Sequence, residues 1–308
     1  AAEVAPRPMS STVAVGGEAP RAHVAPGTAA SSLRQARRSV VLTAGEPAGP
    51  RAHRVRVPSV IRRSVVPVLL ILVWQAGSSW GWWSTSVLPS PVTVGKELGT
   101  LVGNGQLPSN LLVSLRRALL GAGIGISLGT SLGVFAGLWR PAEEALDSTL
   151  QMMRTLPYLV MLPLFVLWFG IDELPKILII AIGTSLPMYL NTFSAVRTVD
   201  PKLVEMAKSF GLGRVRLLQT VVVPGALPGI LTGLRYSLGI SWLSLVVAEQ
   251  INARSGLGYL ISNAQQFFLP SVLLVCVVVY AALGLGTDLV VRFLERRFLA
   301  WRGSVARW

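Results

Sequence analysis

The sequence of 308 residues has few charges, one cysteine and two histidines. Charged residues make up 14% of it, against about 25% in a soluble domain, and its mean hydropathy is +0.58. His23 and His53 both precede the first long apolar run, which excludes a histidine-based metal site or catalytic triad within the apolar region. A single cysteine, Cys276, excludes an intramolecular disulfide, and we expect it to be a small apolar filler.

A nucleotide-binding motif is also missing. No G-x-x-x-x-G-K-[ST] phosphate loop occurs in the sequence, and this loop is what cradles the phosphates of ATP in many ATPases. We therefore expect the chain to bind no cofactor and to hydrolyse no ATP.

Six stretches have the length and the apolar character of membrane-spanning helices. A helix crosses the hydrocarbon in about 20 residues. Five of these stretches carry no charge and the sixth carries only Arg235; they cover residues 118–139, 155–171, 177–196, 255–287, 64–83 and 228–248. The sequence therefore predicts an all-α membrane protein with about six transmembrane helices.

The placement of the basic residues predicts the orientation. The chain has 28 Lys and Arg against 14 Asp and Glu. If the N-terminus is cytoplasmic, 23 basic residues fall on the inside and 5 on the outside, as the positive-inside rule requires. The net charge of +14 is therefore explained by membrane topology and by contact with lipid, and it does not indicate nucleic acid.

The chain divides into a transmembrane domain and two tails. Residues 1–57 are rich in Arg, Pro and Ala without an apolar period, which is typical of disorder. We expect a transmembrane domain at 58–299 and a cytoplasmic C-terminal tail at 300–308.

Glycine and proline predict how the spans pack. Two four-residue glycine repeats form stripes that let a neighbouring helix approach closely; they consist of Gly121, Gly125, Gly129, Gly133 and Gly137, and of Gly225, Gly229 and Gly233. Pro157 and Pro163 predict that the third span is kinked or broken, either beside a transport pathway or as a simple kink. Residues 249–269 mix polar and apolar side chains, and we expect a short helix there, entering from the outer face.

The segment 200–224 has the features of a helix-turn-helix on the cytoplasmic surface. Asp200 and Pro201 supply an N-cap and a first helical position. Gly211 is expected to end the helix in the left-handed conformation. A second helix should begin at Arg214 and end at Pro224.

The spacing of this segment resembles a loop motif of bacterial ATP-binding-cassette (ABC) importers. Their permease subunits carry Glu-Ala-Ala, three residues, Gly, nine residues, Ile, one residue, Leu-Pro. The positions that match here, with Met for Ala and Val for Ile and Leu, are Glu205, Met206, Ala207, Gly211, Val221, Val223 and Pro224. The segments "LPSP", "SLRRALLG", "VPGALPGILTGLRYSLGISWLSLVVAEQI" and "SGLGYLI" are similar to the branch that imports aliphatic sulfonates, taurine, nitrate or bicarbonate.

The resemblance implies a set of partners and a role for the loop. It implies a bacterial plasma-membrane permease that forms a homodimer, pairs with two ATPase subunits that use ATP and Mg, and receives its solute from an extracellular or periplasmic solute-binding protein. The residues that it assigns to contact with the ATPase are Leu203, Val204, Glu205, Met206, Ala207, Lys208, Ser209, Phe210, Gly211, Leu212 and Pro224. The alternative is an amphipathic helix that rests on lipid headgroups.

Several polar and aromatic residues are candidates for the substrate pathway. Arg116 and Arg117 lie near the outer end of the second span, where a charge is a functional candidate, although they are equally able to reach the headgroups. Glu249 ends the fifth span and is a candidate gate contact. Tyr189, Asn191 and Trp242 lie along the fourth and fifth spans.

Two other functions were compared with the permease. A stand-alone secondary carrier or channel for a small solute remains the alternative, but carriers usually place paired acids at mid-membrane, and acids are nearly absent from these spans. An intramembrane enzyme is disfavoured because the spans contain no catalytic set of His, Cys pairs or clustered acids.

Overall fold

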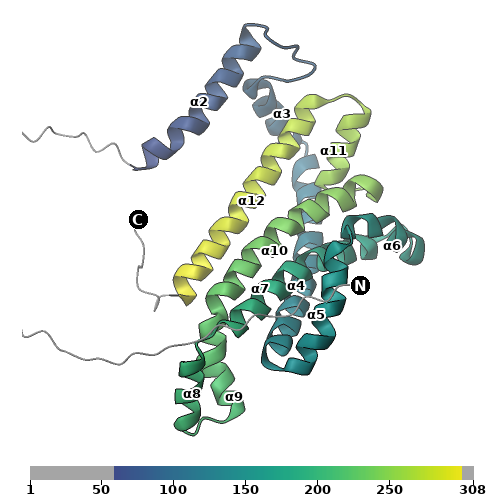
Figure 1. Cartoon of the computed structure of the whole chain (residues 1–308). Coiled ribbons are helices and arrows are strands. Elements are labelled where there is room, and N and C mark those ends of the chain that lie inside the picture. The colour runs from purple at the N-terminus through teal and green to yellow at the C-terminus, as the bar shows by residue number, and fades with distance from the viewer. Residues whose placement is uncertain (1–58, 300–308) are drawn as a thin grey trace, which may run out of the picture. The chain divides into compact units, whose positions relative to one another are not determined.

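The computed structural model describes residues 59–299, so the expected tails at 1–57 and 300–308 lie outside the described residues. Every regular element in the described range is a helix (Figure 1), which confirms the all-α fold class. The elements are α2 (Ser59–Ser79), α3 (Pro91–Gly103), α4 (Gln106–Leu138), α5 (Arg140–Thr155), η1 (Tyr158–Met161), α6 (Leu162–Phe169), α7 (Glu173–Arg197), α8 (Pro201–Ser209), α9 (Arg214–Leu217), η2 (Leu218–Val222), α10 (Val223–Asn252), α11 (Leu257–Gln266) and α12 (Pro270–Phe298).

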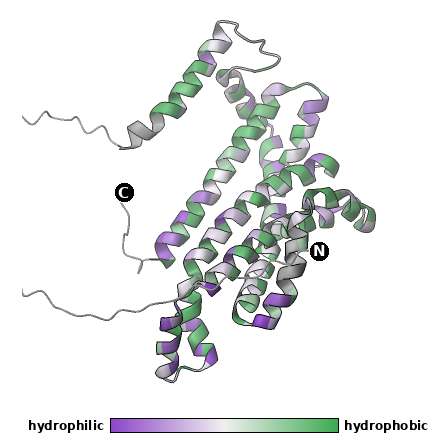
Figure 2. Ribbon diagram, viewed as in Figure 1, coloured by the Kyte–Doolittle hydropathy of each residue, from purple (hydrophilic) through white to green (hydrophobic). Residues whose placement is uncertain are grey.

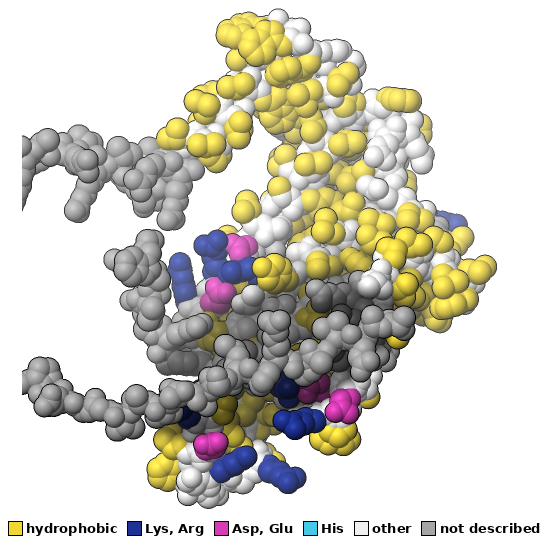
Figure 3. Space-filling view, in the orientation of Figure 1, with side chains coloured by type: hydrophobic (Ala, Val, Ile, Leu, Met, Phe, Trp, Pro, Cys, Tyr) yellow, Lys and Arg dark blue, Asp and Glu magenta, His cyan; other side chains and the backbone are white. Residues whose placement is uncertain are grey.

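Six apolar helical stretches correspond to the expected spans. Four are long and apolar enough to cross a membrane: Gln106–Leu138, Glu173–Arg197, Arg214–Ile251 and Pro270–Phe298. Val65–Ser79 and Tyr158–Phe169 are shorter apolar helices in the places of the first and third spans. Hydrophobic residues predominate along much of the long helices (Figure 2), and charged side chains gather in the lower half of the view (Figure 3).

The third expected span is broken, as its prolines predict. α5 ends at Thr155, the one-turn helix η1 follows Pro157, and α6 then covers only Leu162–Phe169. Pro157 has no N–H to continue α5, whereas Pro163 lies in the first turn of α6, where a missing N–H is tolerated.

The charge-free stretch 255–287 contains two helices instead of one. The short helix expected within 249–269 is α11, and α12 starts at Pro270. Between them Phe268 has a positive φ of 52°, and Pro270 occupies the first turn of α12. The turn and the proline together separate the two helices.

Two glycine stripes hold α7 between α4 and α10. A Cβ at Gly121 would lie 2.6 Å from the Ile180 Cβ, and one at Gly133 would lie 2.7 Å from the Thr192 Cβ. On the other side, a Cβ at Gly233 would lie 2.8 Å from the Asn191 Cβ. These distances are too short for a side chain, so the glycines allow the three helices to touch almost backbone to backbone.

Pro224 does not end a helix, and this expectation was wrong. The chain from Arg214 to Ile251 is a continuous helix in which the π-helical segment η2 lies between α9 and α10. The Val223 N–H bonds to the Leu218 carbonyl, five residues earlier. A π-turn in advance of the proline shifts the hydrogen-bond register, so that the helix continues past a residue without an N–H.

The glycine stripe leads to a test of helix packing. We predict that Gly129→Ala destabilises the protein by about 1–3 kcal/mol through overpacking, because the new Cβ would lie 2.8 Å from the Met188 Cβ. Gly123→Ala, on the same helix with no atom within 4 Å of its Cβ, should stabilise the helix slightly. Melting curves of the two purified variants in detergent should shift in opposite directions, and equal shifts would contradict the packing role.

Candidate functional site

The loop between α7 and α10 begins with the expected helix. Asp200 precedes α8, and its carboxylate accepts a hydrogen bond of 2.9 Å from the Lys202 N–H. Pro201 occupies the first turn, where its missing N–H leaves no gap. The capping predicted at Asp200 and Pro201 is therefore confirmed.

Gly211 ends this helix in the left-handed conformation, as predicted. Its φ is 75°. The Gly211 N–H bonds to the Lys208 carbonyl at 2.9 Å, and the Leu212 N–H bonds to the Ala207 carbonyl at 3.2 Å. These two bonds form a Schellman motif, which satisfies the last carbonyls of α8 and turns the chain toward α9.

The two sides of α8 differ in burial. Ala207 is buried and Val204 is half-buried against the rest of the chain. Leu203, Met206 and Phe210 are exposed by 48%, 53% and 77%. Large apolar side chains on the outer side of a short helix outside the spans are typical of a docking surface for another protein.

The other residues assigned to the loop are distributed around this surface. Glu205, Lys208 and Ser209 are exposed, and Leu212 is half-buried. Pro224 lies apart from them, in the first turn of α10. The structure therefore gathers the assigned residues on α8 and its turn, and excludes Pro224 from that surface.

A second group of candidate residues lies at the other end of the helices, around Arg117. The Arg117 Nη1 donates to Glu249 Oε1 at 2.7 Å, and its Nη2 donates to Glu173 Oε1 at 2.6 Å. Nη1 also donates to the Ser255 carbonyl at 2.6 Å. Arg117 is 2% exposed and Glu249 is fully buried. The guanidinium thus joins α4, the start of α7, the end of α10 and the turn before α11.

Glu249 has further partners that hold the turn before α11. The Ser114 Oγ donates to its carboxylate at 2.8 Å, and the Gly258 N–H does so at 2.8 Å. Gly256 has a φ of 118°, and a Cβ there would overlap the Glu249 carboxylate. The Gly-x-Gly of "SGLGYLI" is therefore required by the close approach of the turn to a buried charge.

The structure separates the two arginines that the sequence treats alike. Arg116 is exposed, whereas Arg117 is saturated by two carboxylates and a carbonyl. The sequence analysis missed Ser114, Glu173 and Gly258. Ser114 could have been found, because it lies three residues before Arg117 and this spacing places both side chains on one side of a helix.

The remaining pathway candidates have different environments. Tyr189 is 1% exposed and stacks on Phe193 with ring centroids 5.9 Å apart. Trp242 is 9% exposed and packs in the apolar core of α4, α6, α7 and α10. Asn191 lines a cavity of about 510 Å³ with Thr198, Thr232 and other residues. Within residues 59–299, no three His, Cys, Asp or Glu side chains gather in a way that would hold a metal ion.

The buried charges lead to a stability test. We predict that Glu249→Gln destabilises the protein by about 3–5 kcal/mol, because it removes one partner of a buried ion pair. Glu143→Gln is the control, since Glu143 pairs at 3.0 Å with Arg197, which is 43% exposed, and a pair of this kind contributes about 0–1 kcal/mol. If the Glu249→Gln protein melts at the wild-type temperature in detergent, the cluster has no structural role.

Comparison with known proteins shows the family. A family model described as "binding-protein-dependent transport system inner membrane component" matches residues 125–300. The aliphatic sulfonates transport permease protein SsuC of Escherichia coli (strain K12) is 48% identical over 236 residues, which are 77% of this chain and 90% of the relative. The taurine transport system permease protein TauC of the same organism is 35% identical over 77% of this chain and 88% of the relative.

A solved structure shares the fold. The crystal structure of an amino acid ABC transporter with histidines superposes with a TM-score of 0.54 at 21% identity, over 65% of this chain and 97% of that chain. The family model matches more than half of the sequence, the two relatives are matched over 90% and 88% of their own length, and the solved structure shares the helical fold. The chain therefore belongs to the inner-membrane permease components of binding-protein-dependent ABC transport systems.

Proposed function

We propose that the chain forms the translocation pathway for a small aliphatic sulfonate, driven by ATPase subunits that dock on the loop 200–224. The substrate class is supported by the relative named for aliphatic sulfonates, which is 48% identical over 90% of its own length. A second relative is named for taurine, which also carries a sulfonate group. Nitrate and bicarbonate, the other solutes of the branch, share the single negative charge but have no alkyl chain.

The proposal includes a set of partners. Two copies of the chain would form the pathway, and two separate ATPase subunits would bind ATP and Mg and supply the energy. A solute-binding protein would deliver the sulfonate at the outer face. The chain would lie in a bacterial plasma membrane with a cytoplasmic N-terminus, which places α8 on the same side as the ATPase and the Arg117 cluster on the opposite side.

The observation that carries the coupling role is the apolar side of α8. Leu203, Met206 and Phe210 are all about half exposed or more, although Ala207 and Val204 on the same helix pack inward. A hydrophobic helix side fits a hydrophobic groove on a partner protein. Because α8 follows α7 after only three residues, a shift of the docked helix would move α7 as a rigid body.

The turn after α8 supplies the experiment. We predict that Gly211→Val lowers uptake of a labelled short alkanesulfonate in cells that coexpress the ATPase and the solute-binding protein. Val at a φ of 75° is strained by about 1–2 kcal/mol, and no atom lies within 4 Å of its Cβ, so the strain arises from the backbone alone. The amount of permease in the membrane should stay normal.

Gly213→Val is the matched control. Gly213 lies two residues further on, has a φ of −67°, and likewise has no atom within 4 Å of its Cβ. Its variant should transport at the wild-type rate. Wild-type transport by Gly211→Val at normal abundance would show that the geometry of the loop is unimportant, and absence of alkanesulfonate uptake by the wild-type system would refute the substrate class.

A further inference from the structure

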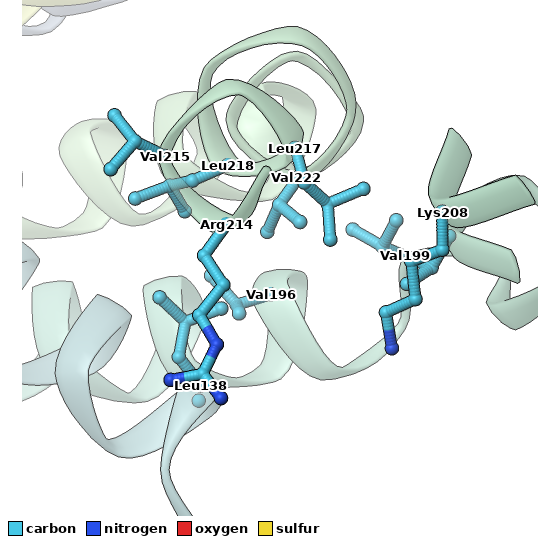
Figure 4. Close-up of a pocket in the computed structure, with 11 residues that line it drawn as sticks. Leu138, Val196, Val199, Lys208, Arg214, Val215, Leu217, Leu218 and Val222 are labelled. Carbon is cyan, nitrogen blue, oxygen red and sulfur yellow. The ribbon is translucent and has the colours of Figure 1, made fainter. Parts of the chain in front are cut away.

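A cavity that is open on one side lies between the loop 200–224 and the ends of α4 and α7. Its volume is about 530 Å³, which falls in the range of small-molecule sites, roughly 300–1,000 Å³. The ends of α4 and α7, together with α8, α9 and η2, contribute its walls (Figure 4). A bound molecule would therefore touch both helices of the loop and the two spans beneath them.

The walls combine apolar surface with two cations. Val199, Leu218 and Val222 are among the aliphatic residues that line the cavity. Lys208 from α8 and Arg214 from α9 also line it (Figure 4). The lining residues include no Asp or Glu. Both cations are exposed, and an anion with an alkyl chain would match both kinds of surface, the charged and the apolar.

Neither cation forms an ion pair with another described side chain of the chain. Arg197 pairs with Glu143, and Arg235 pairs with Asp288. Among the described side chains, by contrast, no acid forms an ion pair with Lys208 or Arg214. The cavity therefore has positive charge available for a ligand.

We propose that this cavity is a binding site for a free alkanesulfonate, distinct from the transport pathway. The sulfonate oxygens would accept charge-assisted hydrogen bonds from the Lys208 ammonium and the Arg214 guanidinium, and the alkyl chain would lie on Val199, Leu218 and Val222. The choice of a sulfonate head rests on the proposed function. The site would place a molecule of the transported class inside the loop that couples the permease to its ATPase.

The test measures binding to the purified permease without ATPase, in nanodiscs of phosphatidylcholine. Octanesulfonate, titrated calorimetrically below its micelle concentration, should bind the wild type and bind Lys208→Gln/Arg214→Gln at least tenfold more weakly. Lys202→Gln/Arg216→Gln removes two cations from the same helices that do not line the cavity, and its affinity should stay within twofold of wild type. Octyltrimethylammonium, with the same chain and the opposite charge, should not bind at the site.

A second variant and a second membrane complete the test. Leu218→Trp should also weaken octanesulfonate binding by filling the cavity, and it provides the answer if the charge variant elutes as an aggregate in gel filtration. Equal affinity in all variants would overturn the proposal. If phosphatidylglycerol in the disc competes with octanesulfonate through Lys208 and Arg214, the occupant is an anionic lipid and the assignment to a free alkanesulfonate is wrong.

The failure of this site can be told apart from failure of the proposed function. If octanesulfonate does not bind although cells take up alkanesulfonate normally, the cavity proposal alone is contradicted. If octanesulfonate binds through the two cations although cells show no uptake, the substrate class of the transporter is contradicted instead.

Discussion

The close contact of α7 with two glycine stripes is the constraint on which the rest of the structure depends. Lipid tails are as apolar as leucine, so spans associate through close packing rather than through the hydrophobic effect. α4 contributes glycines from Gly121 to Gly137 on one side of α7, and α10 contributes Gly229 and Gly233 on the other. As a result α7 is fixed along its length, and its two ends connect the two candidate sites.

Each end of α7 is tied to a different kind of interaction. At one end, Glu173 shares Arg117 with the buried Glu249, so the start of α7, the end of α10 and the turn before α11 are linked through one guanidinium. At the other end, the chain passes within three residues into α8 and its exposed apolar side. Buried charges are costly unless they are paired and hydrogen-bonded, and Arg117 and Glu249 meet this requirement at the end of α7 opposite the loop.

The local features of the loop could be predicted from the sequence because their causes are local. Asp200, Pro201 and Gly211 act through the backbone within a few residues, and the Schellman turn at Gly211 follows from glycine's access to positive φ. The break at Pro157 and the glycine stripes follow from the same kind of argument. The expectation that Pro224 ends a helix was wrong, because a π-turn placed before a proline depends on the hydrogen-bond register of the whole helix.

The pairing of Arg117 with Glu249 could not be predicted, because 132 residues separate them and nothing in the local pattern specifies which acid an arginine will meet. The burial of Tyr189 and Trp242 could not be predicted either, because it depends on how several helices pack together. The cavity between α8, α9 and the ends of α4 and α7 is likewise a product of tertiary arrangement. Local sequence thus predicts the loop, whereas long-range packing determines its surroundings.

The central claim is that the apolar side of α8 docks on a separate ATPase. Site-specific photocross-linking in cells that coexpress the ATPase tests it most directly. A benzophenone amino acid at Phe210, which is 77% exposed on the loop, should form a covalent adduct with the ATPase subunit, and the same probe at Phe267, which is 67% exposed beyond α11, should form none. Absence of an adduct from Phe210, or equal adducts from both positions, would contradict the account.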